Sequence, residues 1–209
     1  MEKQSIFKKP WVQSIIGIVV IVLCLLGLIV YKSLSSKVSI DTSMIEAPII
    51  NIGPQSEGVL QQVSVQEGDM VTKGETVAQV GGEVLTAQVD GLVIAVNNVP
   101  GEVVMPGQMV VSMIEPKELR VVGTIDEDKG LSKIAVGDTA TFTVDAFGGQ
   151  TFTGIVDEIS PTSDDTSIAF SISDKRPTKQ FDVKVLYDVA AHPEFKNGMS
   201  AKLNIYPKS

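Results

Sequence analysis

The sequence predicts a mainly β protein, with two small β-domains behind one membrane-spanning helix. Three observations carry this prediction. Residues 11–31 form an apolar run without charge, residues 55–113 contain one glycine-punctuated pattern twice, and residues 115–207 contain further short runs with alternating apolar residues. Short Val- and Ile-rich runs between glycine turns are typical of strands rather than helices.

The apolar run Trp11–Tyr31 is expected to be an uncleaved transmembrane helix. Its 21 residues, at a rise of about 1.5 Å each, would span about 30 Å, the thickness of the hydrocarbon core. The run is longer than the apolar region of a signal peptide, and no A-x-A-like cleavage site follows it. Three lysines precede it and two follow, which places residues 1–10 in the cytoplasm.

Charge and cysteine content exclude several classes of function. The formal net charge is −8, and the first 37 residues carry five lysines against one glutamate, which leaves −12 for residues 38–209. An ectodomain this acidic, with two arginines, has no footprint for nucleic acid. Cys24 is the only cysteine, so an internal disulfide is excluded, and we interpret it as an apolar thiol within the membrane run.

The stretch from Gln55 to Met113 is one pattern in two copies, offset by 33 residues. Each copy has a glycine, a valine-rich strand, a Gly-acid turn, a short strand, a second glycine turn and a last strand. Two copies predict a closed, pseudo-symmetric β-domain, in which valine at Gly58 or Gly91 would destabilise by similar amounts. The pairs in register are Gln55/Gln88, Gly58/Gly91, Val63/Val96, Gly68/Gly101, Val71/Val104, Gly74/Gly107 and Val77/Val110.

These motifs carry a resemblance to a known family. The segments Ser56–Leu60 and Val65–Gly74, with Val89–Val93 and Val99–Gly107 in the second copy, each resemble half of a biotinyl/lipoyl domain. Residues 38–207 as a whole resemble the HlyD-type membrane-fusion proteins, the adaptors of bacterial transporters. The resemblance implies a lipoyl-like β-sandwich from two repeated halves, followed by a small β-barrel.

The expected domain order follows from this resemblance. The sandwich should be followed by a barrel that the strand over Lys37–Ile45 joins from the N-terminal side. The expected divisions are a cytoplasmic N-terminus (1–10), a transmembrane helix (11–31), a connector with that strand (32–47), the lipoyl-like domain (48–114, with halves 52–80 and 85–114) and the β-barrel domain (115–209).

The junction Val80–Val84 restricts what this domain can do. Gly81-Gly82 between two strands is a tight-hairpin signal. In most members of the resembled family an α-helical hairpin is inserted here, but about four residues cannot hold one, so the chain is expected to be a hairpinless variant. Carrier domains place a modifiable lysine on this turn. Lys73, the only lysine of the repeat, lies in another turn and is expected to be a solvated charge.

The barrel region is expected to contain short strands and one short helix, over Asp126–Ile134. The helix prediction rests on acidic residues in the first turn, which suit the helix dipole. The expected strands are Leu119–Ile125, Thr139–Val144, Thr151–Ile159, Ile168–Ile172, Phe181–Val189 and Ala201–Tyr206.

No catalytic, cofactor-binding or metal-binding residue is predicted. His192 is the only histidine and has no cysteine partner for a metal or catalytic role. The run Asp126–Asp128 is better explained as a helix start than as a cation site. Asp164-Asp165 lacks the alternating oxygen spacing of a calcium loop.

Two functions from different classes fit these observations. The preferred one is a single-pass cell-membrane adaptor of an export or efflux transporter, acting by protein contacts on the extracytoplasmic side. Its expected partner is an ABC-type permease, and a homo-oligomer is allowed. The alternative is a membrane-tethered envelope module that binds peptide or glycan ligands without a transporter.

Overall fold

The computed structural model describes residues 37–163 and 178–208. Within these two ranges, no helix is both long enough and apolar enough to cross a bilayer. Four features of the sequence lie outside the described residues: the run Trp11–Tyr31, Cys24, the pair Asp164-Asp165 and the expected strand Ile168–Ile172.

The barrel domain is a closed antiparallel sheet of six strands. The strands are β1 (Val38–Glu46), β10 (Arg120–Asp126), β11 (Thr139–Val144), β12 (Thr151–Ile159), β13 (Gln180–Leu186) and β14 (Ser200–Tyr206). Their order around the barrel is β1-β10-β13-β12-β11-β14, and β1 pairs with β14 to close it. Closure leaves no free edge strand on which another chain could add.

The second domain is a β-sandwich of two four-stranded sheets. Its strands are β2 (Ile49–Ile52), β3 (Gly58–Val63), β4 (Met70–Val71), β5 (Thr76–Val80), β6 (Glu83–Thr86), β7 (Gly91–Val96), β8 (Val103–Val104) and β9 (Val111–Ile114). One sheet has the order β2-β9-β7-β4 and the other β6-β5-β3-β8.

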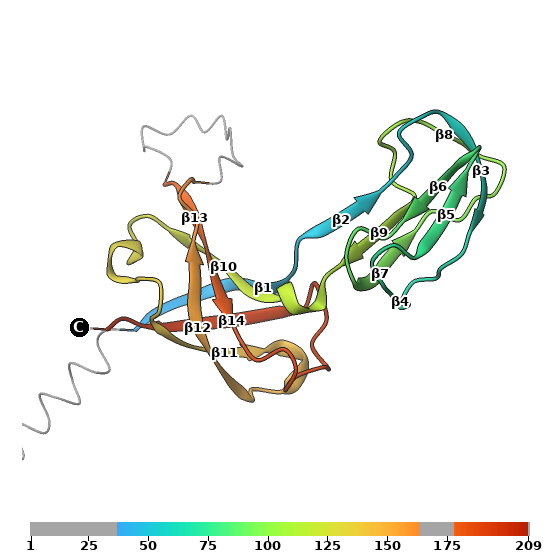
Figure 1. Ribbon diagram of the computed structural model, residues 1–209. Helices are drawn as coiled ribbons and strands as arrows, with labels where there is room; N and C mark the ends of the chain where they lie inside the picture. Colours follow the sequence, from blue (N-terminus) through green and yellow to red (C-terminus); the bar gives the residue numbers. More distant parts are fainter. Residues whose placement is uncertain (1–36, 164–177, 209) are drawn as a thin grey trace, which may run out of the picture.

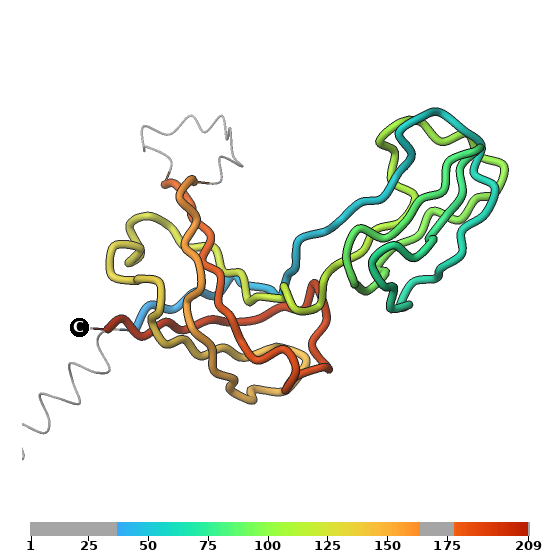
Figure 2. Tube along the Cα trace, viewed as in Figure 1, coloured from blue at the N-terminus to red at the C-terminus, as the bar shows by residue number. Residues whose placement is uncertain are grey.

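The sandwich is inserted in the chain between the first two strands of the barrel. The chain completes β1, builds the sandwich, and returns through the 3-10 helix η2 (Pro116–Glu118) to begin β10. Figures 1 and 2 show β2 and β9 side by side as the two connections between the domains. The start of β1 and the end of β14 lie together on the side of the barrel away from the sandwich (Figure 1).

The two halves of the sandwich have the same strand register. Gly58 lies opposite Val104 in the β3–β8 pair. Gly91 lies opposite Val71 in the β7–β4 pair. This is the same pairing with the two copies exchanged, because Gly91 corresponds to Gly58 and Val71 to Val104 at the 33-residue offset. A β-bulge interrupts the β3–β5 pair, and a bulge at the equivalent position interrupts β7–β9. Since each half pairs its short strand with the other half, the two copies interlock.

Glycines in the left-handed region form the repeated turns. Gly68 and its counterpart Gly101 have φ angles of 95° and 91°, and Gly74 and Gly107 have 87° and 77°. Residues with a Cβ rarely adopt these angles. The glycine spacing seen in the sequence is therefore a conformational requirement of the turns.

Gly58 and Gly91 have a different role, because neither has a positive φ. A Cβ at Gly91 would meet the backbone carbonyl oxygen of Ile114 at 2.6 Å, whereas a Cβ at Gly58 would meet a side-chain atom of Val80 at 3.0 Å. Both glycines allow a neighbouring strand to approach, and the approach is closer at Gly91. Valine at the two positions should therefore have unequal effects, unlike the expectation from the sequence.

A two-residue hairpin joins the halves. Val80 and Glu83 are the last paired residues of β5 and β6, so Gly81 and Gly82 alone form the turn. Gly81 has a φ of 55°, as the first turn position of a type II′ hairpin requires. The prediction that no α-helical hairpin is inserted here is confirmed.

The two domains have hydrophobic cores of different composition. The sandwich core is entirely aliphatic, and residues 48–114 contain no aromatic residue. The barrel core is built around Phe142, whose ring centroid lies 5.5 Å from that of Phe152, 5.6 Å from Tyr187 and 6.1 Å from Phe195.

The predicted helix over Asp126–Ile134 is wrong. Asp126 ends β10, and only the 3-10 helix η3 (Leu131–Lys133) follows. Gly130, with a φ of 107°, interrupts the segment. The acidic residues were a weak reason for a helix, because a segment this short cannot offset the free-energy cost of nucleation.

The other strands predicted for the barrel and described by the structure are present. Thr139–Val144 and Thr151–Ile159 are strands with the predicted bounds, and the 3-10 helix η4 (Asp145–Phe147) lies between them. The predicted alternation after β12 also holds, since Val183 and Val185 are fully buried.

Candidate interaction surfaces

His192, the one histidine, belongs to an aromatic cluster at one end of the barrel. Its ring stacks on Phe195, with centroids 5.1 Å apart and planes inclined by 17°, and meets the ring of Phe152 edge-on at 4.9 Å. Its Nδ1 lies 3.2 Å from a carboxylate oxygen of Glu194. These contacts give His192 a packing role.

Asp126, the first residue of the acidic run Asp126–Asp128, is engaged in local pairs. Its carboxylate lies 2.7 Å from the ammonium group of Lys129 and accepts a hydrogen bond from the side-chain amide of Gln180 at 2.9 Å. The hydrogen bond from Lys129 holds the pKa of Asp126 below its ordinary value, and the same bond raises the pKa of Lys129. Glu127 and Asp128 are exposed. Among residues 37–163 and 178–208, no three His, Cys, Asp or Glu side chains converge.

Lys73 is an exposed residue of the turn that ends at Gly74. Its backbone N–H donates to a carboxylate oxygen of Asp90 at 2.7 Å. The main chain of Lys73 thus fixes the turn, while the ammonium group faces solvent.

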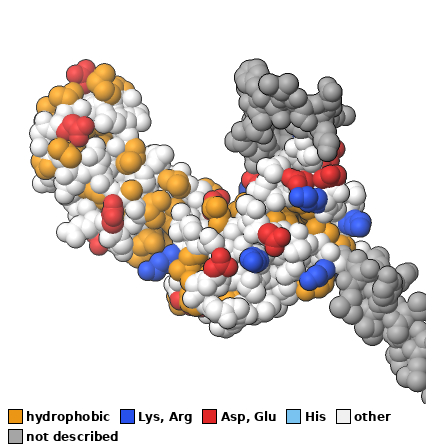
Figure 3. Space-filling view, turned by 180° about the vertical axis from the view of Figure 1, so that it is seen from behind, with side chains coloured by type: hydrophobic (Ala, Val, Ile, Leu, Met, Phe, Trp, Pro, Cys, Tyr) orange, Lys and Arg blue, Asp and Glu red, His pale blue; other side chains and the backbone are white. Residues whose placement is uncertain are grey.

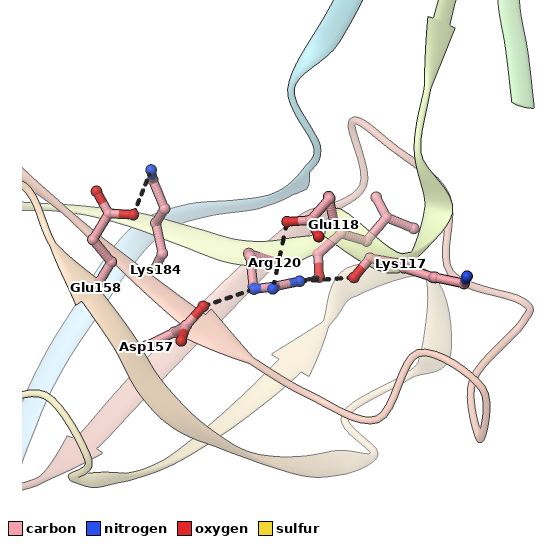
Figure 4. Close-up of polar contacts among 7 residues, drawn as sticks. Lys117, Glu118, Arg120, Asp157, Glu158 and Lys184 are labelled. Atoms are coloured by element: carbon pink, nitrogen blue, oxygen red, sulfur yellow. Dashed lines mark hydrogen bonds and ion pairs between the residues drawn. The ribbon is translucent and has the colours of Figure 1, made fainter. Parts of the chain in front are cut away.

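A charged groove lies where the barrel meets the sandwich connections. It has a volume of about 280 Å³ and is lined by the end of β1, the start of β10 and the outer faces of β12 and β13. Figure 4 shows charged side chains that line it. They include Glu118, Arg120, Asp157, Glu158 and Lys184.

Arg120 ties the returning connection to the barrel wall. Its Nε donates to Asp157 at 3.0 Å, and its Nη1 donates to the backbone carbonyls of Lys117 at 2.9 Å and Leu119 at 3.0 Å. Its Nη2 lies 3.6 Å from Glu118 (Figure 4). The Arg120 side chain is only 16% exposed. Charge-assisted hydrogen bonds in such a partly buried site are stronger than those in open solvent.

The second ion pair in the groove is weaker. Lys184 and Glu158 lie 3.0 Å apart, but their side chains are 40% and 51% exposed. Water and salt screen such a pair, so it contributes at most about 1 kcal/mol. Of the two basic residues that line the groove, Arg120 therefore makes the stronger interactions.

The sandwich turns one of its two equivalent faces toward the barrel. Leu92 and Ile94 on β7 pack against the barrel's hydrophobic cluster, which extends to Ile114. The residues at the same positions of β3 are Val59 and Gln61. Both are exposed, Val59 by 46%. The second copy of the repeat therefore contacts the barrel, whereas the equivalent face of the first copy is exposed to solvent.

Sequence reasoning missed the junction. Arg120 carries no local signal, because its partner Asp157 is 37 positions away in the chain. Its position directly after the Glu115–Glu118 turn was the one available hint. The arrangement joins the two domains by polar and apolar contacts, and among the described residues it brings together no three His, Cys, Asp or Glu side chains.

Comparison with known proteins agrees with this architecture. No family model matches the chain. A protein of Bacillus subtilis (strain 168), named "Putative efflux system component YhbJ", is 28% identical over 138 residues. The match covers 65% of this chain and 59% of YhbJ, so the chain spans less than two thirds of that protein's length.

Solved structures share the fold at low sequence identity. A MacA-MexA chimeric protein, which contains the Pseudomonas aeruginosa MexA α-hairpin domain, has a TM-score of 0.68 at 16% identity, over 83% of this chain and 81% of its own. The membrane fusion protein Spr0693 from Streptococcus pneumoniae R6 has a TM-score of 0.59 at 15% identity, over 84% of this chain and 100% of its own. The chain thus has the fold of membrane-fusion adaptor proteins, as the two half-motifs predicted.

Proposed function

We propose that this chain is a membrane-anchored adaptor subunit of an export or efflux transporter, acting by protein contacts and without chemistry. The observation that carries the proposal is the insertion of the sandwich into the barrel on two connections, one of them clamped by Arg120. Any displacement of the barrel is passed to the sandwich through both connections. An adaptor needs this coupling, whereas a tethered ligand-binding module does not.

The proposed placement follows from the sequence and the fold together. Residues 11–31 anchor the chain in the cell membrane as a single span, residues 1–10 are cytoplasmic, and the β-domains are extracytoplasmic. The partner is a permease, and an ABC-type permease is the class we favour. The shared adaptor fold and the name of the relative YhbJ support this assignment.

The sandwich acts here as a lipoyl-like domain that carries no prosthetic group. The Gly81-Gly82 turn holds no lysine, so there is no amine at the position where a carrier presents its cofactor. The same turn removes the projecting hairpin, and with it the reach toward a distant channel. Contacts with the permease therefore come from the anchor and from the exposed loops of the barrel.

Crosslinking in native membranes tests the proposal. Photo-crosslinkers placed in exposed barrel loops, followed by mass spectrometry, should identify a permease. The chain should stay with membranes through alkaline washing, and intact mass should show neither biotin nor lipoate on Lys73. Crosslinks to peptide or glycan ligands, with no permease at any site, would support the tethered binding module and overturn the adaptor.

A further inference from the structure

We propose that the barrel binds the surface of an anionic lipid bilayer at the end where β1 begins. The proposal rests on the proposed function, in which residues 11–31 anchor the chain. The binding surface, called here the basal patch, is a set of exposed apolar and basic side chains. It consists of Lys37, Lys133, Val136, Ile155, Tyr206 and Lys208.

Hydrogen bonds hold one side of the basal patch together. The Lys208 ammonium group donates to the carbonyl oxygen of Gly137 at 2.7 Å, which places this lysine beside Val136. The nearby carboxylate of Asp138 is buried and accepts hydrogen bonds from the backbone N–H groups of Ala135 and Lys208, at 2.8 and 3.0 Å. Asp138 therefore offers no exposed negative charge to the patch.

Strand pairing holds the other side together. On the outer wall of the barrel, Thr139 of β11 lies opposite Ile155 of β12 and opposite Tyr206 of β14. Since β1 pairs with β14 from Val38 onward, Lys37 comes next to Tyr206. The patch thus runs across three neighbouring strands of the barrel to the start of β1.

The apolar members of the patch belong to neither core. Val136 is 64% exposed, Ile155 54% and Tyr206 40%. Apolar side chains beside a tyrosine and lysines suit the headgroup region of a bilayer, where amphipathic side chains have both a polar and an apolar environment. Figure 3 shows single basic side chains among hydrophobic and acidic ones on one face of the barrel.

The length of the connector brings this end of the barrel to the membrane. Six residue steps separate Tyr31, the last residue of the apolar run, from Lys37. Even fully extended, they reach only about 20 Å. The sandwich lies on the opposite side of the barrel (Figure 1). Of the two domains, the barrel is therefore the one held at the bilayer surface.

The charge of the patch itself favours the same orientation. Its three lysines are exposed and are attracted by anionic lipids. Anchor and patch together would fix the tilt of the ectodomain, so that the barrel could not pivot freely on its connector.

Fluorescence quenching by lipids tests the proposal on the full chain. The chain with Cys24→Ser and Val136→Cys carries a fluorophore at position 136. It is reconstituted into vesicles of phosphatidylcholine and phosphatidylglycerol, some with a spin-labelled headgroup that quenches nearby fluorophores. We expect strong quenching at position 136. The combined variant Lys37→Gln, Lys133→Gln and Lys208→Gln, or high salt, should reduce it, because both remove the attraction to anionic lipid.

Two control positions separate docking from proximity. Met70→Cys on the sandwich has the same 64% exposure as Val136. Ala146→Cys is an exposed site in η4, which follows the end of β11, whereas the patch lies at the start of β11. Neither should be quenched as strongly as position 136. Equal quenching at 146 and 136, or none at 136, would overturn the proposal.

Two further outcomes distinguish the partner and the anchor. Shielding of position 136 only when a permease is present, and never in lipid vesicles, would overturn the proposal in favour of a protein contact. Loss of the chain from membranes on alkaline washing would instead overturn the proposed function. Retention of the chain without quenching at 136 would overturn the lipid proposal alone.

Discussion

The sandwich and the barrel reach closed β structures by different routes. In the sandwich, two copies of one aliphatic pattern interlock, and their turns are set by glycines at a fixed offset. In the barrel no pattern repeats, and aromatic rings from different strands and loops meet in the core. Local turns therefore specify the sandwich, whereas contacts between a few large side chains that are far apart in the sequence specify the barrel.

The largest expected effect comes from breaking the aromatic centre of the barrel. Phe142 is fully buried, so Phe142→Ala should lower the free energy of unfolding by about 3–5 kcal/mol. The matched change in the sandwich is Leu60→Ala, also at a fully buried position, with an expected loss of about 2–4 kcal/mol. Urea titration of the purified protein measures both.

Near-ultraviolet circular dichroism distinguishes the two domains, because the sandwich contains no aromatic residue. The midpoint of urea unfolding in the near-ultraviolet signal should shift for Phe142→Ala and stay unchanged for Leu60→Ala. The far-ultraviolet signal should respond to both variants. Equal shifts of both signals in both variants would show one cooperative unit and remove the distinction between the domains.

Within the sandwich, the two closely packed glycines sharpen the comparison between copies. Gly91→Val should destabilise by about 3 kcal/mol, because the added Cβ meets a backbone oxygen at 2.6 Å. Gly58→Val should cost about 1–2 kcal/mol, because the added Cβ meets the Val80 side chain at 3.0 Å and backbone atoms only at 3.2 Å and beyond. Thermal or urea unfolding gives both values. Equal losses would favour strict equivalence of the halves, as the sequence alone suggested.

Most of the sandwich was predictable because its signals are local. A positive-φ glycine such as Gly68 marks its own turn, and Gly81-Gly82 marks the hairpin without reference to distant residues. The barrel strands were also predictable from alternation. Their order was not, because pairings such as Val38 with Ile205 join residues from opposite ends of the domain.

The junction was unpredictable for the same reason. The interactions of Arg120 depend on the path of β12, which places Asp157 beside the returning connection. The helix error at Asp126–Ile134 arose because acidic residues were read as a helix start, whereas Asp126 instead pairs with Lys129 at the end of a strand. Charged residues in short loops are weak predictors of structure, since several local arrangements satisfy them.

The junction itself provides a prediction of intermediate size. Arg120→Ala should destabilise by about 2 kcal/mol, because it removes charge-assisted hydrogen bonds to Asp157 and to two backbone carbonyls. It should also speed proteolysis at the returning connection. Lys184→Ala, in the exposed ion pair of the same groove, should change stability by less than about 0.5 kcal/mol. Similar effects of the two variants would show that Arg120 is no clamp.

The smallest expected effect concerns a polar group inside the aromatic core. Tyr187 is buried, and its hydroxyl has no hydrogen-bond partner among the described residues. Tyr187→Phe should therefore raise the free energy of unfolding by about 1 kcal/mol at neutral pH, since a buried hydroxyl without a partner loses its hydrogen bonds to water and gains none in the protein. Tyr206→Phe is the control, because that ring is 40% exposed, and its effect should stay within about 0.5 kcal/mol.

Alkaline pH should widen the difference between wild type and Tyr187→Phe. Burial raises the pKa of Tyr187 to about 12, above the value of about 10 in an unfolded chain. Folding therefore favours the protonated form of Tyr187. The resulting contribution to the free energy of unfolding is complete below pH of about 10 and is lost as the pH rises toward 12. Wild type should lose stability across this window more steeply than Tyr187→Phe in urea titrations at each pH. Parallel curves would mean that the hydroxyl reaches water, and that the barrel core is less dry than its aromatic packing indicates.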